Sequence, residues 1–216
     1  MTVIKYSPLR LVMQLSIAAL VLTALIACGN TDKAKDGNTD HSAHQGASSG
    51  SSYCDSVNTG LINADTLKGS PHRVAMNTIG NTHVHIEYNS PGVKDRVIWG
   101  GLVAYDKVWV TGAHKATTIK LDNPVIFGDK KIPAGKYAIF TIPGKENWTF
   151  ILNTRHDQHL ADEYSEQEDV LRMSVTPAAS EMVQRLTYAV NSSGENKGAI
   201  EISWEKLKLT VPFTAE

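Results

Sequence analysis

Residues 74–88 read VAMNTIGNTHVHIEY, in which two short runs of strand-forming residues flank the pair Gly80-Asn81. A Gly-Asn pair between two such runs is a turn signal that favours a β-hairpin. The second run alternates between apolar and polar residues, so every second side chain is expected to face the core. The stretch therefore predicts two antiparallel strands with one buried face.

Similar short runs, separated by turn residues, continue along the chain from this hairpin to residue 211. They are residues 102–110, 116–121, 125–127, 136–142, 148–153, 170–175, 185–190, 199–204 and 207–211. Many short strands at this spacing are typical of an antiparallel sandwich or a barrel. We predict an all-β, jelly-roll-like antiparallel β-sandwich that forms a single domain. Its one short helix is expected at residues 177–182, which begin with a proline.

The last of these runs change their apolar periodicity near Glu205-Lys206. Apolar residues occupy positions 200, 202 and 204 before this point and positions 207, 209 and 211 after it. Side chains along a strand alternate with a period of two, so this change corresponds to one inserted residue. We expect a β-bulge or a sharp bend here.

The first residues have the organisation of an export signal. Lys5 and Arg10 form a positive region before the largely apolar residues 11–26, a stretch that is short for a membrane-spanning helix. The run Leu-Ile-Ala-Cys that ends at Cys28 resembles a bacterial lipobox. We therefore expect cleavage of a signal peptide of residues 1–27 and attachment of lipid to Cys28. An ordinary secretory signal or a single membrane anchor is the alternative.

The segment after Cys28 is expected to be a flexible linker. Residues 29–52 contain almost no large apolar side chain, so they cannot bury enough surface to offset the entropy of ordering. We therefore divide the mature chain into a lipidated linker of residues 28–70 and a folded domain of residues 71–216. Lipid at Cys28 would hold the protein in the cell envelope. We expect the outer rather than the inner membrane, because Gly29 is no obvious inner-membrane retention signal.

Composition limits the classes of function that the chain can serve. The formal net charge of the whole chain is −1, which argues against a nucleic-acid-binding protein. The chain has two cysteines, so lipid on Cys28 leaves Cys54 without an intramolecular disulfide partner. We expect a monomer that meets the membrane through its lipid and meets an envelope partner or a small ligand through its domain.

Histidines mark the candidate site. His83 and His85 share the polar face of their run with Glu87. Residues two apart in a strand are about 6.6 Å apart, so the two imidazoles can converge on one Zn or Cu ion. His114 lies at a Gly-containing corner and His159 in a polar stretch after a strand, and such loops often carry sites. We predict a metal site whose ligands come from these four histidines; a polar strand surface without function is the alternative.

Three functions stay open at this point. The sequence contains no nucleophile elbow, Walker loop or His-Glu-x-x-His helix. The first hypothesis is a lipid-anchored domain that binds a ligand or a metal through a His-lined site. The second is an envelope hydrolase in which three histidines hold a metal that activates water, with Glu87 or Asp162 as the base. The third is a purely structural or interaction lipoprotein.

Several motifs resemble one bacterial family. They are PGVKDRVIWGGLV at residues 91–103, Trp109, Thr-Gly-Ala at 111–113, IPAGKY at 132–137 and Trp-Glu at 204–205. Together, over about residues 71–213, they resemble the domain of unknown function 2911 family, whose members are often secreted or lipid-anchored. The resemblance implies a β-sandwich-like domain and no particular activity.

The chain departs from the common pattern of that family at two places. Many members have Arg after the Trp109 position and Asn-Glu after Thr-Gly-Ala, where this chain has Val110 and His114-Lys115. It is similar to a subgroup that carries His-x-His, Thr-Gly-Ala-His and Gln-His-Leu-Ala-Asp together.

The tryptophans and the paired glycines of these motifs are explained by the packing of the fold. Trp99, Trp109, Trp148 and Trp204 are expected to be buried anchors of the core. The pair at positions 100 and 101, both glycine, is expected to allow a tight turn or a close approach of the backbone.

Overall fold

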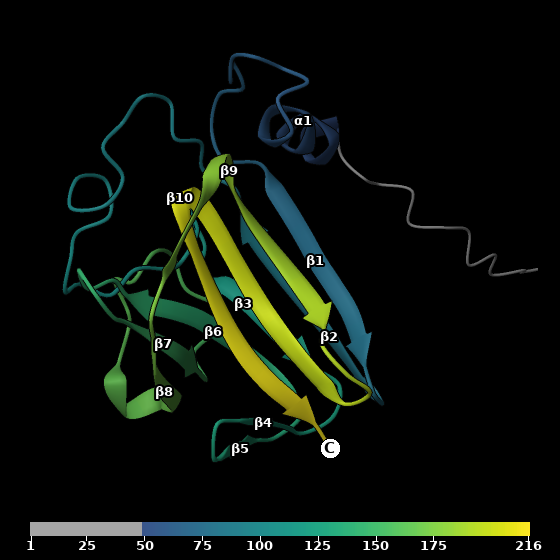
Figure 1. The fold of residues 1–216 in the computed structure, drawn as a ribbon. Helices are drawn as coiled ribbons and strands as arrows, with labels where there is room; N and C mark the ends of the chain where they lie inside the picture. Colours follow the sequence, from purple (N-terminus) through teal and green to yellow (C-terminus); the bar gives the residue numbers. More distant parts are fainter. Residues whose placement is uncertain (1–48) are drawn as a thin grey trace, which may run out of the picture. The chain divides into compact units, whose positions relative to one another are not determined.

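The computed structural model describes residues 49–216, which form two antiparallel β-sheets and one α-helix (Figure 1). The elements in chain order are α1 (Ser49–Asn58), β1 (His72–Ile79), β2 (Thr82–Asn89), β3 (Thr117–Leu121), β4 (Val125–Phe127), β5 (Lys130–Ile132), β6 (Gly135–Ile142), β7 (Trp148–Asn153), the 3-10 helix η1 (Glu166–Glu168), β8 (Asp169–Val175), β9 (Ala178–Ser192) and β10 (Lys197–Ala215). The predicted all-β sandwich is confirmed. The expected signal peptide, Cys28 and the expected linker up to residue 48 lie outside the described residues.

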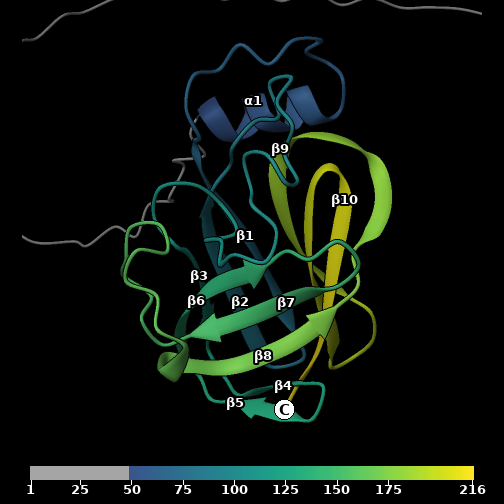
Figure 2. The same cartoon turned by 90° about the vertical axis from the view of Figure 1, so that its left-hand side faces the viewer.

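The two sheets have six and four strands. The larger sheet has the order β1-β2-β3-β6-β7-β8 and the smaller one the order β5-β4-β10-β9. Strands β6 to β8 cross β9 and β10 (Figure 2), and one apolar core takes side chains from both sheets. From α1 to β10, no helix is long and apolar enough to cross a membrane.

The hairpin of β1 and β2 has the form that the sequence predicts. The two strands pair along their whole length, and Ile79 faces Thr82 across the turn. Gly80 has a φ of +57°, a left-handed conformation that glycine adopts at little cost. On β2, the apolar side chains are buried and the alternate ones face outward. The alternation in the sequence therefore decides which side chains of β2 stay accessible.

The four tryptophans lie between the sheets, as predicted. Trp148 and Trp204 are buried, and Trp99 and Trp109 are partly buried against the same core. Their ring centroids are 4.7 to 6.4 Å apart, and four of the five close pairs meet edge to face, an arrangement that aromatic rings prefer. The tryptophans thus form the aromatic centre of the core.

The predicted tight turn at residues 100 and 101 is confirmed. Gly100 has a φ of +80°, which favours glycine. A Cβ atom on Gly101 would lie 2.3 Å from the carbonyl oxygen of Val97, so no larger residue fits there without moving the backbone.

The irregularity in the last strand is also confirmed. β10 is one strand of 19 residues, and its register with β9 shifts on both sides of Glu205. Glu205 itself has a φ of +54°. The bulge lets the side chains of Trp204 and Leu209 point into the same core although they are five positions apart.

A second, smaller apolar cluster covers part of the outer face of the larger sheet. Ala138, Phe140 and Ile151 of β6 and β7 pack there against Val110 and Ala116 of the loop that precedes β3. On β1 and β2, by contrast, the outward side chains remain partly or fully exposed. This uncovered part of the sheet holds the candidate site described below.

Two predicted elements are wrong. Residues 177–182 are not a helix, because β9 begins at Ala178 and its first residues pair with Lys208 and Leu207 of β10. The long partner strand satisfies the backbone of this segment and outweighs its local helix propensity. Residues 102–110 are a loop instead of a strand, because Asp106 takes a left-handed φ of +59° and Trp109 forms only a single bridge, to Thr141.

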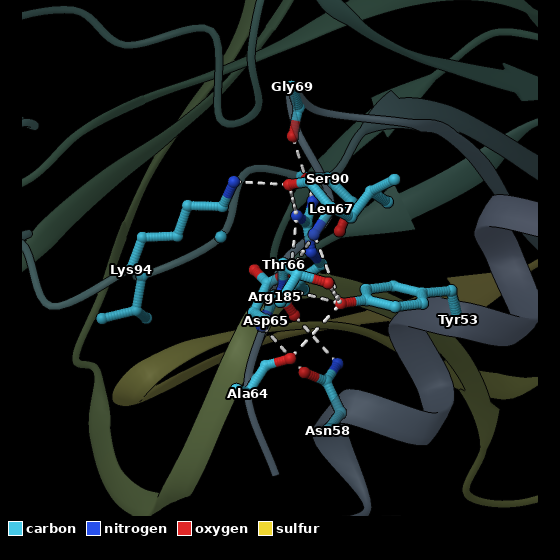
Figure 3. A network of polar contacts seen from close by, with 12 residues as sticks. Tyr53, Asn58, Ala64, Asp65, Thr66, Leu67, Gly69, Ser90, Lys94 and Arg185 are labelled. Atoms are coloured by element: carbon cyan, nitrogen blue, oxygen red, sulfur yellow. Dashed lines mark hydrogen bonds and ion pairs between the residues drawn. The ribbon is translucent and has the colours of Figure 1, made fainter. Parts of the chain in front are cut away.

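The structure corrects the expected linker for residues 49–70. Helix α1 buries Cys54 and Val57 against the domain, and Asn58 Nδ2 donates a hydrogen bond of 3.0 Å to the carbonyl oxygen of Arg185. In the loop that follows, Asp65 Oδ1 accepts a hydrogen bond of 2.8 Å from Arg185 Nη2 (Figure 3). An ion pair and two buried apolar side chains therefore attach residues 49–70 to the sheets, although the overall composition of this segment is polar. The folded domain includes α1 instead of beginning at residue 71.

Candidate functional site

The uncovered outer face of the larger sheet carries a groove made of two adjoining pockets of about 320 and 250 Å³. Glu87, Thr118 and Lys136 line both pockets. We call this surface the polar groove. Its basic side chains are Lys115, Lys120 and Lys136, together with the histidines at positions 72, 83, 85 and 156. Its acidic side chains are Glu87 and Asp157.

Strand register brings the central residues of the polar groove together. Glu87 on β2 pairs with Thr118 on β3, and the neighbouring residue pair on the same face is His85 with Lys120. Lys120 in turn pairs with Lys136 on β6. Directly opposed residues of an antiparallel pair have side chains about 5 Å apart, so these groups form one continuous surface.

Glu87 is the centre of this surface. Its Oε2 lies 3.3 Å from Lys136 Nζ and its Oε1 lies 3.5 Å from His85 Nε2. Burial acts to raise the pKa of the Glu87 carboxyl, but the hydrogen bond and the charge of Lys136, with His85 and His72, lower it overall. A general base works best when its pKa lies near the working pH, and the shift moves the pKa of Glu87 away from neutrality. The ion pairs of Glu87 and the direction of this shift therefore give little support to the hypothesis that Glu87 is the base of a hydrolase.

His83 and His85 lie side by side, as predicted. Their ring centroids are 6.3 Å apart and the ring planes are tilted by 47°. His83 Nδ1 is 3.1 Å from the hydroxyl of Thr78, which leaves Nε2 for another contact. The pair can supply two imidazole nitrogens to a ligand or an ion.

His114 and His159 lie elsewhere. Their segments are adjacent, since Leu160 N donates a hydrogen bond of 2.7 Å to the carbonyl oxygen of His114. The side chain of His159 is 67% exposed, and its Nδ1 is 3.9 Å from Asp162, the other predicted base, which is 75% exposed. His114 lines a different cavity. Across residues 49–216, no three His, Cys, Asp or Glu side chains are grouped so as to hold a metal, so the four predicted ligands do not share one site.

Most of the basic side chains of the polar groove could not be recognised from the local sequence pattern that indicates His83 and His85. His72 has the outward parity of Val74 and Met76 on β1, so extending the alternation by one step would have found it. Lys136 could not be found in this way, because it enters the groove only through the pairing of β3 with β6. Lys115 and His156 come from two loops that meet at the edge of the groove.

Comparison with curated proteins and with solved structures finds no match for this chain. Comparison with family models finds one match, over residues 70–213, to the family described as "Protein of unknown function (DUF2911)". The matched region runs from just before β1 almost to the end of β10, so it includes both sheets and the polar groove. The chain therefore belongs to the DUF2911 family, as its motifs suggest.

Proposed function

We propose that this protein is a lipid-anchored envelope protein whose β-sandwich binds a small anionic ligand in the polar groove. The observation that carries the proposal is the balance of charged side chains, since three lysines and four histidines line the groove against two carboxylates. Glu87 is already paired with Lys136, and Lys120 is paired with Asp122 beside the groove. Lys115 forms no ion pair within residues 49–216, so its ammonium group is available to a ligand.

The chemistry of the polar groove suits phosphate or carboxylate oxygens. Lysine ammonium groups only donate hydrogen bonds, and the hydroxyl of Thr118 can donate as well. The two pockets together have the size of a small-molecule site. Because these charges are partly exposed, their attraction for an anion is screened by salt, and we expect the affinity to fall as ionic strength rises.

Inorganic phosphate is the first probe, measured by titration calorimetry on the purified full chain in detergent at pH 6. The variant Glu87→Gln is expected to bind phosphate about five to ten times more tightly, because one negative charge near the bound anion is removed. Glu181→Gln, on the exposed start of β9, is the matched control and should leave the affinity unchanged. A wild-type protein that does not bind phosphate, or two variants with equal affinity, would contradict the proposal.

The pair His83 and His85 supports a second candidate, a Cu or Zn ion held by two imidazoles with the remaining positions open to water or ligand. The same Glu87→Gln variant separates the two candidates. It removes a negative charge 3.5 Å from His85 Nε2, so it should weaken binding of a metal while it strengthens binding of phosphate. A structural or interaction protein would respond to neither probe.

The membrane anchor has its own test. Cys28→Ser is expected to abolish incorporation of a radiolabelled fatty acid and to release the protein from the membrane fraction, because the thiol that accepts the lipid is lost. Cys54→Ser serves as the control, since Cys54 is buried in α1 and should not be lipidated. Membrane attachment that persists in Cys28→Ser would show that another segment anchors the chain.

A further inference from the structure

A second cavity of about 320 Å³ lies apart from the polar groove and shares no lining residue with it. Its walls come from the loop before β3, from the loop that carries Leu160 and from β10. The side chains that matter for its chemistry are Arg96, Leu102, Trp109, His114, Leu160 and Trp204. We call it the tryptophan pocket.

The backbone around the tryptophan pocket is strained. Thr111, His114 and Leu160 have φ values of +51°, +64° and +51°, in the left-handed region that favours glycine or asparagine. Hydrogen bonds hold this conformation, because the carbonyl oxygen of Thr111 accepts from Tyr188 and Leu160 N donates to His114. Glycine or asparagine would relax positions 114 and 160, yet the chain places there two side chains that line the pocket. Strain of this kind tends to occur at functional sites.

One wall of the pocket is flat and apolar. The partly buried ring of Trp109 stacks on the buried ring of Trp204, with centroids 5.8 Å apart and planes tilted by 21°. Leu102 and Leu160 are 49% and 40% exposed and line the same cavity. Such a wall suits a planar apolar group.

The polar groups of the pocket suit a carboxylate. Arg96 has no carboxylate partner within residues 49–216, and its Nε and Nη2 donate to the carbonyl oxygens of Val93 and Gly92. These two bonds orient the guanidinium group and leave Nη1 without a partner, so it can donate to a ligand. His114 is exposed on the same cavity, and the buried Nε1–H of Trp204 has no acceptor among the described side chains and backbone groups.

We infer that the tryptophan pocket binds a small carboxylate with a planar apolar body, in which the body lies against Trp109 and the two leucines and the carboxylate meets Arg96. This site differs from the polar groove in residues and in ligand, because it needs an apolar body as well as a negative charge. A negative result for the tryptophan pocket therefore leaves the proposal for the polar groove unaffected, and the reverse also holds.

Phenylacetate is the probe for this inference, compared with phenylacetamide, which lacks the charge, and with acetate, which lacks the body. Binding to the full chain in detergent is followed by the change in tryptophan fluorescence and by calorimetry. We expect phenylacetate to bind at least five times more tightly than either comparison compound. Arg96→Gln should bring phenylacetate down to the affinity of phenylacetamide and leave phenylacetamide unchanged. Equal binding of all three compounds, or no binding of phenylacetate, would overturn the inference.

Leu160→Gly separates a binding role from a purely structural one. The substitution removes a wall of the pocket and also relaxes a left-handed residue, so the thermal midpoint should rise or stay the same while phenylacetate binding weakens at least fivefold. Asp106→Gly is the matched control, since Asp106 has a φ of +59° but does not line the pocket, and it should not change binding. If Leu160→Gly binds phenylacetate as the wild type does, or if Asp106→Gly weakens binding equally, the assignment of the pocket is wrong.

Discussion

Replacing Asp65 by Ala is expected to lower the free energy of unfolding by about 3–5 kcal/mol. The side chain of Arg185 is 0% exposed and that of Asp65 is 5% exposed, and Asp65 is the carboxylate with which Arg185 pairs. The guanidinium group also donates to the carbonyl oxygens of Gly69, Ser90 and Leu67 (Figure 3). These carbonyl groups carry no net charge and cannot neutralise the guanidinium group. The variant therefore leaves the buried charge of Arg185 without a counter-ion.

Urea denaturation of the full chain measures this effect, and Asp122→Ala provides the control. Asp122 and Lys120 form an ion pair of similar length, 2.9 Å, but both side chains are exposed. Exposed pairs of this kind contribute little, so the control should leave the unfolding midpoint unchanged. The double variant Asp65→Ala, Arg185→Met should recover part of the loss, because it removes the buried charge itself. Equal midpoints for Asp65→Ala and Asp122→Ala would show that the loop of residues 60–70 is not held in solution.

Replacing Trp204 by Ala is expected to cost about 3–5 kcal/mol of the free energy of unfolding. Trp204 is 2% exposed, and its ring contacts those of Trp99 and Trp109 at centroid distances of 5.8 Å. The variant loses the burial of the largest side chain and leaves a cavity at the centre of the core. The β-bulge next to it fixes the local backbone, which limits how far the site can collapse.

The same denaturation experiment with two further variants tests the explanation. Trp204→Phe keeps most of the apolar volume and should lose about half as much stability or less. Leu61→Ala changes a residue that is 82% exposed and should stay within about 0.5 kcal/mol of the wild type. A loss for Trp204→Ala that is no larger than the loss for Leu61→Ala would mean that the tryptophan cluster does not stabilise the fold.

Local patterns in the sequence predicted a large part of the fold. The Gly-Asn turn, the alternation of β2 and the change of parity before Leu207 each depend on residues that are near one another in the chain, and each was confirmed. The predicted helix at residues 177–182 was wrong because these residues favour a helix locally, whereas their partners in β10 lie 28 to 30 positions further along the chain. The short strand β5 was missed because two of its three residues are lysines.

The candidate site could be predicted only in part, because local patterns do not show which distant residues come together. His83, His85 and Glu87 share one face because a strand alternates, and this could be read directly from the sequence. His114 and His159 were grouped with them because both are polar loop residues, but sequence carries no information on which loop faces which sheet. Lys136 lies 49 positions after Glu87 in the chain and reaches it across β3.

The sequence by itself determined that this chain forms antiparallel strands, which faces of those strands are buried, and where the last strand bends. It also carries the lipobox-like motif at Cys28, on which the proposed anchor depends. Only the tertiary structure decided that β3 lies between β2 and β6, that residues 49–70 pack on the domain through Asp65 and Arg185, and that the basic side chains form one groove. The physical reason is that side-chain parity is a property of each strand, whereas strand order and loop docking depend on contacts between distant residues that local propensity does not encode.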